Sequence, residues 1–315
     1  MKTLKNNKYV RLIIFVILFF LLFKYVSLVL EDYSCRWMKG KYYAGTSGCD
    51  TVVFGTSHVL YGIYPEVMDE AGVHGVYNLG GYAQRIPTSY WILKYAVDHG
   101  RPKPKTVILD LHCLLHDDKY PTENIQYLHS SLDTVPLTAD KIKMVNDIIP
   151  DHKMEFLMDI FVYHDRWNEL TLHDFEVLRY FLPGYLGLQN GALYKDETED
   201  EGEPVIISED EKEEPTGTGR EYLDKIIDLC NENDIDLILI NMPYNEPEAD
   251  QKAANWIKDY SEEKGFLYYD MLRDNSLGID YASDYCGSGH FNRTGATKVS
   301  KALAEYILTG SSELE

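Results

Sequence analysis

Residues 50–58 read DTVVFGTSH, and this stretch decides how the rest of the chain is interpreted. Its first part is a short run of β-branched and aromatic residues, which is typical of a strand covered on both faces. Gly55 ends the run and Ser57 follows. Ligands of an open parallel sheet bind at the carboxyl ends of its strands, so we expect Ser57 at a binding site. A serine here is also an ordinary helix N-cap, and this stretch alone assigns no function.

Four more runs of strand character follow along the chain, at residues 75–79, 106–111, 235–241 and 266–271. Helix-like segments alternate with them, at residues 88–99, 219–232, 248–264 and 294–308. This alternation predicts an α/β fold in which a five-stranded parallel sheet lies between two layers of helices.

Two segments interrupt the alternation within a single domain that spans residues 31–310. Residues 115–190 are rich in aromatic residues and predict a helical insertion. Residues 195–216 are mostly acidic and predict a mobile surface loop, because they bury too little apolar surface to offset their ordering entropy. A calcium site is the alternative for this loop, but the DxDxDG spacing is missing.

The N-terminus has the pattern of a membrane anchor. Basic residues within residues 1–11 precede an apolar stretch over residues 12–30, long enough to cross a hydrocarbon core of roughly 30 Å. Lys24 lies near the far end, where its side chain can reach the headgroups. Basic residues before the helix predict a cytoplasmic N-terminus and an extracytoplasmic domain on a single-pass protein of the cell membrane. A cleavable signal peptide is the alternative, but no small-x-small cleavage site follows the stretch.

The composition excludes some classes of function. A formal net charge of -21 argues against a nucleic-acid partner, because phosphate binding depends on Lys and Arg contacts. The cysteines have neither CxxC nor zinc-ribbon spacing, and the sequence leaves open whether Cys35 and Cys49 pair. His112 and His116 lie four residues apart, like a metal-binding pair, but no HExxH motif and no clear third ligand accompany them. We therefore expect neither a metal nor another cofactor.

A second polar motif lies near the other end of the chain, where residues 284–292 read DYCGSGHFN. His290 stands in a glycine-rich loop just before the last predicted helix, from which it can serve as the general base for Ser57. Gly80 and Gly81 follow the second strand, where unhindered N–H groups can form an oxyanion hole or an ordinary turn. Gln84 is either an additional donor to the substrate or a solvated residue at a helix start.

The motifs GTSH at residues 55–58, NLGG at residues 78–81 and GHFN at residues 289–292 resemble those of the SGNH/GDSL hydrolase superfamily. More narrowly, the chain is similar to a membrane-anchored bacterial branch with DltD-like and alginate-acetylation-type proteins. The resemblance covers about residues 50–308 without the acidic segment. It implies a flavodoxin-like three-layer fold, a serine nucleophile at Ser57 and a histidine base at His290. It also implies an oxyanion hole made by the amide of Ser57 and an amide of Gly80 or Gly81.

His58 follows the serine where the most familiar members of the family carry other residues, and we assign it no role. This sequence departs from the family pattern in two further places. The family's histidine usually follows an aspartate by three residues, but Gly287 occupies that place and the nearest acid is Asp284. We expect either Asp284 or a backbone carbonyl to orient His290. The asparagine of the family's third motif is also absent, since residues 109–112 read LDLH. Both departures concern groups that assist the serine and the histidine.

Insertions in this branch tend to lie over the site, so the resemblance implies that Arg166 and Trp167 contact the substrate. Packing of Trp167 on the core and pairing of Arg166 with a carboxylate is the alternative. The implied function is that of a serine-dependent esterase or acyltransferase on acyl esters of a cell-surface polysaccharide or teichoic-acid-like polymer, beside a multi-span membrane O-acyltransferase. The alternative is a non-catalytic accessory protein that presents the polymer to that acyltransferase.

Overall fold

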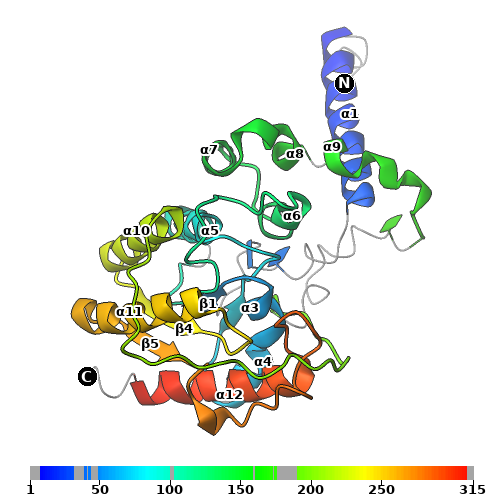
Figure 1. Ribbon diagram of the computed structural model, residues 1–315. Coiled ribbons are helices and arrows are strands. Elements are labelled where there is room, and N and C mark those ends of the chain that lie inside the picture. Colours follow the sequence, from blue (N-terminus) through cyan, green and yellow to red (C-terminus); the bar gives the residue numbers. More distant parts are fainter. Residues whose placement is uncertain are drawn as a thin grey trace.

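The computed structural model is centred on a five-stranded parallel sheet of order β2-β1-β3-β4-β5 (Figure 1). It describes residues 8–31, 39–40, 42–43, 49–99, 103–158, 160–172, 174–175 and 190–310. The strands are β1 (Thr51–Phe54), β2 (Val76–Asn78), β3 (Thr106–Asp110), β4 (Asp236–Asn241) and β5 (Leu267–Asp270). All neighbouring strands pair in parallel, in the order of a flavodoxin-like sheet, so the predicted fold class is confirmed.

Helices cover both faces of the sheet. One face carries α5 (Ile86–His99), α10 (Thr218–Glu232) and α11 (Glu248–Lys264). The other carries α3 (Ser57–Gly62), α4 (Pro65–Glu70) and α12 (Arg293–Gly310). Successive side chains of a strand point to opposite faces, so Val52 and Phe54 enter the first core while Val53 enters the second. This double coverage explains why the strands lack the alternation of a half-exposed sheet.

Short helices and 3-10 turns lie between residues 126 and 168 of the predicted insertion. They are α6 (Gln126–Leu132), α7 (Ala139–Ile148), α8 (Lys153–Leu157), α9 (Ile160–Tyr163) and the 3-10 turns η2 (Pro150–His152) and η3 (His164–Asn168). Met144 and Val145 of α7 enter the core beside α5, which attaches this insertion to the domain. One further 3-10 turn, η5 (Asn275–Leu277), follows β5.

The acidic segment, residues 195–216, lies against α11 and is held by hydrogen bonds. The Nδ2 atom of Asn255 donates to the carbonyls of Ser208 and Glu211 at 3.1 and 3.0 Å. Gln251 exchanges two bonds with the backbone of residues 205–207. Polar side chains of α11 thus satisfy part of the backbone of the segment. Mobility of this loop, inferred from its low apolar content, stays a prediction.

The N-terminal helix α1 (Lys8–Leu30) extends away from the body of the domain (Figure 1). It is long and apolar enough to cross a membrane, with a mean hydropathy of 2.8. Most of its length is exposed outside the domain. Much of the predicted basic tail and Cys35 lie outside the described residues, and Cys49 is buried, so pairing of Cys35 with Cys49 stays open.

Candidate active site

Ser57 lies in the first turn of α3, directly beyond the carboxyl end of β1. The cap of this helix is Thr56, whose Oγ1 accepts a hydrogen bond from the amide of His58 at 3.2 Å. Ser57 is therefore not needed as the N-cap, and its hydroxyl faces another group. That group is the imidazole of His290, whose Nε2 lies 2.7 Å from Oγ of Ser57. The two predicted residues, far apart in the sequence, thus meet at hydrogen-bond distance.

The surroundings of His290 favour its neutral form. Burial lowers the pKa of His290 below its ordinary value, and the nearby charge of Lys195 lowers it further. A hydrogen bond to the backbone of Gly287 opposes this lowering of the pKa. A neutral imidazole at neutral pH can accept a proton, so His290 is suited to act as the base for Ser57.

Asp284, one of the two candidates for the group that orients His290, has other partners. Its Oδ2 accepts hydrogen bonds from the amide of Asp280 at 2.7 Å and from Nζ of Lys298 at 2.6 Å. Its side chain is buried, and a buried carboxylate is stabilised by such a cation. The ring of His290 is bonded to the backbone of Gly287 instead, which is the alternative that the sequence left open.

The loop before His290 has an unusual backbone and two supports from distant residues. Gly287, Ser288 and Gly289 have φ angles of 95°, 55° and 71°, so three consecutive residues are left-handed. The carboxylate of Glu201 accepts a hydrogen bond from the amide of Gly289 at 2.8 Å. A Cβ at residue 289 would lie 2.7 Å from Nε2 of His58, so only glycine fits there. Such strain persists only where the surroundings hold it.

His58 belongs to a buried group of aromatic rings beside the base. Its ring centroid lies 4.1 Å from that of His112, 4.7 Å from that of Tyr244 and 5.6 Å from that of His290. Burial, followed by the two neighbouring histidines, lowers the pKa of His58 well below its ordinary value, while a bond to the backbone of Ser288 opposes this. Burial also lowers the pKa of His112 to about 4. Both rings are therefore neutral near pH 7. We gave His58 no role from the sequence, where only its place after the serine marks it.

The glycines predicted for the oxyanion hole are bonded within the protein. The amide of Gly80 donates to Oδ1 of Asn78 at 2.9 Å, and the amide of Gly81 donates to the carbonyl of Gly55 at 3.1 Å. These bonds fix the turn after β2, so the turn interpretation matches the structure better than two free donors. The amide of Ser57 lies in the first turn of α3, where N–H groups lack an intrahelical acceptor.

Gln84 also has partners within the protein. Its Nε2 donates to Oγ of Ser89 at 2.9 Å, and its Oε1 accepts from Oγ of Ser131 at 2.6 Å. The side chain is buried, so it is neither the solvated residue nor the free donor that we considered. Because Ser131 belongs to α6, this bond joins the insertion to the turn after β2.

Arg166 and Trp167 lie beside α1. The Nη1 atom of Arg166 donates to the carbonyl of Leu30 at 2.6 Å and also to the carbonyl of Glu31. Its Nη2 lies 3.4 Å from Oδ1 of Asp174. Trp167 is 71% exposed, so it is not packed on the core. The prediction that Arg166 contacts the substrate does not match these contacts, because its guanidinium is engaged at the end of the apolar helix.

A row of tyrosines leads from His290 to the surface. The ring centroid of Tyr61 lies 5.0 Å from that of His290, and its hydroxyl lies 3.1 Å from that of Tyr82. The ring of Tyr82 is followed at 6.2 Å by that of Tyr127, which is 40% exposed. Nζ of Lys195 lies 6.0 Å from the ring of Tyr61. Aromatic faces and a cation thus border the serine and the histidine.

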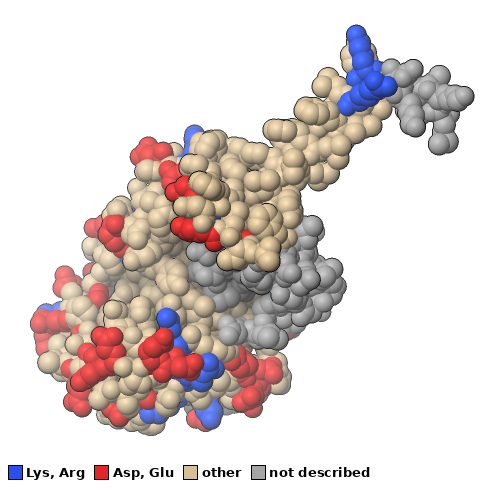
Figure 2. All heavy atoms as spheres, turned by 90° about the vertical axis from the view of Figure 1, so that its right-hand side faces the viewer, with Lys and Arg blue, Asp and Glu red and all other residues tan. Residues whose placement is uncertain are grey.

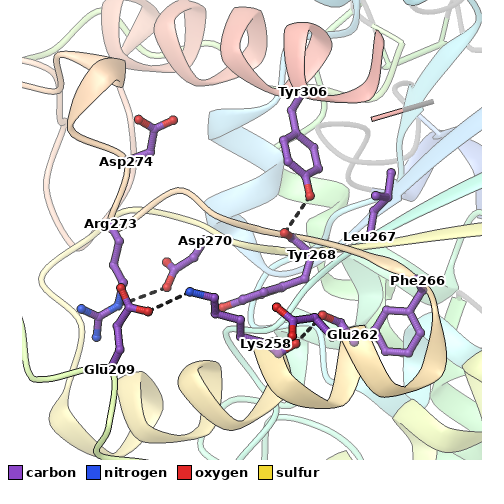
Figure 3. Close-up of a pocket in the computed structure, with 11 residues that line it drawn as sticks. Glu209, Lys258, Glu262, Phe266, Leu267, Tyr268, Asp270, Arg273, Asp274 and Tyr306 are labelled. Atoms are coloured by element: carbon purple, nitrogen blue, oxygen red, sulfur yellow. Dashed lines mark hydrogen bonds and ion pairs between the residues drawn. The ribbon is translucent and has the colours of Figure 1, made fainter. Parts of the chain in front are cut away.

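A separate cavity of about 430 Å³ opens beside β5, between α11 and α12 (Figure 3). Its charged groups face one another: Lys258 lies 2.7 Å from Glu209, and Arg273 lies 3.4 Å from Asp270. Neither the serine nor the histidine of the pair lines it. The cavity is large enough for a small ligand, but its lining residues do not place a base next to a nucleophile as Ser57 and His290 do.

Among the described residues, no group of three or more His, Cys, Asp or Glu side chains is placed to hold a metal ion. Comparison of the sequence and structure with models of protein families, with curated proteins and with solved structures finds no match. The assignment of function therefore depends on the geometry of the site and on the resemblance of its motifs.

Proposed function

We propose that this protein is an SGNH-type serine esterase or acyltransferase that acts on acyl esters of a cell-surface polysaccharide or teichoic-acid-like polymer. The observation that carries the proposal is the 2.7 Å contact between Oγ of Ser57 and Nε2 of His290. The lowered pKa of His290 adds the neutral base that this contact requires. The order of the motifs and the parallel sheet agree with this class.

The reaction would proceed through an acyl-enzyme. Oγ of Ser57 attacks the acyl carbonyl while Nε2 of His290 takes the hydroxyl proton. His290 then returns this proton to the oxygen of the leaving alcohol as the ester bond breaks. Water or a polymer hydroxyl next loses its proton to His290 and attacks the acyl-enzyme. His290 then gives this proton to Oγ of Ser57 as the bond between the acyl group and Oγ breaks. Water gives hydrolysis, and a polymer hydroxyl gives transfer.

The tyrosine row supports a carbohydrate substrate. Sugar rings pack their C–H faces on aromatic side chains, and the half-buried Tyr82 and the exposed Tyr127 offer such faces. Tyr61 is buried and links these two rings to His290. Lys195 forms no ion pair with another described residue and is close enough to lower the pKa of His290. It would suit an anionic group on the polymer.

The proposed location is the outer side of the cell membrane, beside a multi-span O-acyltransferase. Basic residues before α1 favour a cytoplasmic N-terminus, and α1 is apolar enough to cross the bilayer. A C-terminal alkaline phosphatase fusion, active only outside the cytoplasm, should be active. Activity only from a cytoplasmic reporter at the same position would reverse the topology.

Turnover of a small acetyl ester by the full chain tests the enzymatic proposal. Ser57→Ala and His290→Ala should each lower turnover by roughly 10³-fold or more and leave thermal unfolding nearly unchanged. Ser208→Ala, at an exposed serine of the acidic segment, is the matched control and should keep full activity. Near-normal turnover by either site variant would rule out the serine mechanism.

A non-catalytic accessory protein is the second proposal, and specific observations favour it. The amides of Gly80 and Gly81 are bonded internally, and the described residues place no carboxylate on the ring of His290. An accessory protein would bind the polymer without covalent reaction at Ser57, so the two proposals differ in the reactivity of that serine.

A further inference from the structure

Exposed apolar side chains gather on the part of the insertion that adjoins α1. We call residues 160–172 and 174–175 the juxtamembrane lobe. Four of its large apolar residues are more than half exposed: Phe161 at 53%, Trp167 at 71%, Leu172 at 89% and Phe175 at 51%. A space-filling view shows mostly uncharged surface where the body meets the helix (Figure 2). Such a patch on one short segment marks an interaction surface.

The lobe is attached to the last two turns of α1. Both α9 and η3 pack against this helix. Arg166 donates to the carbonyls of Leu30 and Glu31, which are among the carbonyls that a helix end leaves without intrahelical donors. The hydroxyl of Tyr25 donates to the carbonyl of Phe175 at 3.1 Å. The lobe is therefore fixed at a defined level along α1.

This level coincides with the membrane surface. Tyr25 precedes Leu30 by five residues, or about 7 Å along the helix axis at 1.5 Å per residue. A bilayer core takes about 20 apolar residues, and the apolar stretch that begins at Leu12 ends next to Leu30. If α1 crosses the bilayer, the lobe beside its last turns lies in the interfacial region. Interfacial protein segments typically enter about 5–10 Å.

We propose that the juxtamembrane lobe inserts Phe161, Trp167, Leu172 and Phe175 into the interface of the bilayer that α1 crosses. Lipid is the occupant because the lobe packs directly against α1, whose apolar side chains are themselves exposed. Tryptophan is enriched at this depth in membranes. The basic group of Arg166 is bonded to α1, and Asp165 and Glu169 are exposed. The lobe therefore binds by burial of apolar side chains and does not require anionic headgroups.

Depth-dependent quenching of tryptophan fluorescence tests this proposal on the full chain in phosphatidylcholine vesicles. Lipids brominated near the glycerol end of the acyl chain should quench the wild-type chain strongly. Trp37 follows α1 by seven residues in the sequence, so all chains, the wild type included, carry Trp37→Phe. In this background, Trp167→Phe should remove most of the quenchable emission. Trp256→Phe is the matched control, because Trp256 is partly buried on α11 in the body of the domain, and it should leave the quenching unchanged.

Equal quenching of the wild type and of Trp167→Phe would overturn the proposal. So would a Trp167 that aqueous iodide quenches freely in the same vesicles, which is the result expected if the patch is a docking surface for the helices of another membrane protein. Replacement of the zwitterionic lipid by an anionic one should change the quenching less than twofold. A strong dependence on anionic lipid would contradict insertion by apolar burial.

Discussion

Two regions of the domain, one at the β5 edge of the sheet and one beyond the carboxyl end of β1, contrast in what they offer a substrate. The cavity beside β5 has a volume of about 430 Å³, yet its cations lie next to carboxylates (Figure 3). The site at the end of β1 holds a serine hydroxyl against a neutral imidazole, with a lysine that has no carboxylate partner among the described residues. The comparison shows that the volume of a cavity does not by itself identify an active site. Contact between a proton acceptor and a nucleophile is the more informative feature.

The acidic segment supports both regions. In the cavity, Glu209 of this segment pairs with Lys258 of α11, and Nη1 of Arg273 donates to the carbonyl of Ile207. The loop of His290 is held from a distance, by Glu201 in the acidic segment and by His58 after the nucleophile. Changes in these distant supports should therefore affect turnover, whereas changes in the cavity should not.

Gly289→Val is expected to have the largest effect. Residue 289 has a φ of 71°, and a Cβ there would collide with the buried ring of His58. The loop must then shift, and His290 moves away from Ser57. A displaced base can cost on the order of 100-fold in turnover. The control is Gly278→Val, with a φ of 59° and no atom within 4 Å of its Cβ position. Equal losses in the two variants would show that the contact with His58 is unimportant.

Glu201→Ala should lower kcat/KM about tenfold, because the amide of Gly289 loses its acceptor and the loop of His290 loosens. Glu201→Gln keeps an acceptor oxygen and should retain most of the activity. Glu203→Ala removes the same charge at an exposed position of the same segment and serves as the control. If Glu201→Ala leaves the rate and its pH profile unchanged, the acidic segment does not support the loop of His290.

Asp284→Asn separates a structural role from a catalytic one. Its carboxylate binds Lys298 and the amide of Asp280, so the variant should lose about 1–3 kcal/mol of unfolding free energy, measured in urea. Turnover should fall less than tenfold at temperatures where the chain is folded, which corresponds to less than about 1.4 kcal/mol. A loss near 10⁴ with unchanged stability would restore Asp284 as the third catalytic group.

Lys195→Met should shift the pH dependence of the reaction. Lys195 lowers the pKa of His290, so its removal raises that pKa. The acid limb of kcat/KM, where protonated His290 can no longer accept the serine proton, should then move to higher pH. Lys195→Arg should keep the original limb. A shift to lower pH would contradict the electrostatic assignment.

Lys258→Ala in the cavity is expected to have the smallest effect. Its pair with Glu209 is half exposed, and such pairs contribute at most about 1 kcal/mol. Turnover should be unchanged within twofold. A loss comparable to that of Glu201→Ala would make the cavity part of the active region.

The sheet and the serine-histidine pair could be predicted because both depend on local patterns. Buried strands of a parallel sheet are short apolar runs, and their carboxyl ends bring Ser57 and the loop of His290 to one edge. The supports of His290 could not be predicted in the same way. Glu201 is separated from Gly289 by 88 residues, and its contact depends on how the acidic segment crosses the domain.

Two other candidate site residues have partners that local sequence does not show. Asp284 binds Lys298 of α12. A buried carboxylate is stabilised more by such a cation than by the neutral ring of His290. Arg166 binds the end of α1 across 136 residues. In both cases the position of the side chain depends on a partner that is distant in the sequence.

Covalent labelling of Ser57 tests the central claim most directly. The full chain is treated with a fluorophosphonate and the modified peptide is identified by mass spectrometry, with Ser57→Ala and His290→Ala as controls. The account predicts modification at Ser57, none in Ser57→Ala, and labelling at least 100-fold slower in His290→Ala, because the serine loses its base. Absence of labelling at Ser57 in the wild type, in a chain that still binds the polymer, would contradict the enzymatic account and favour the accessory protein.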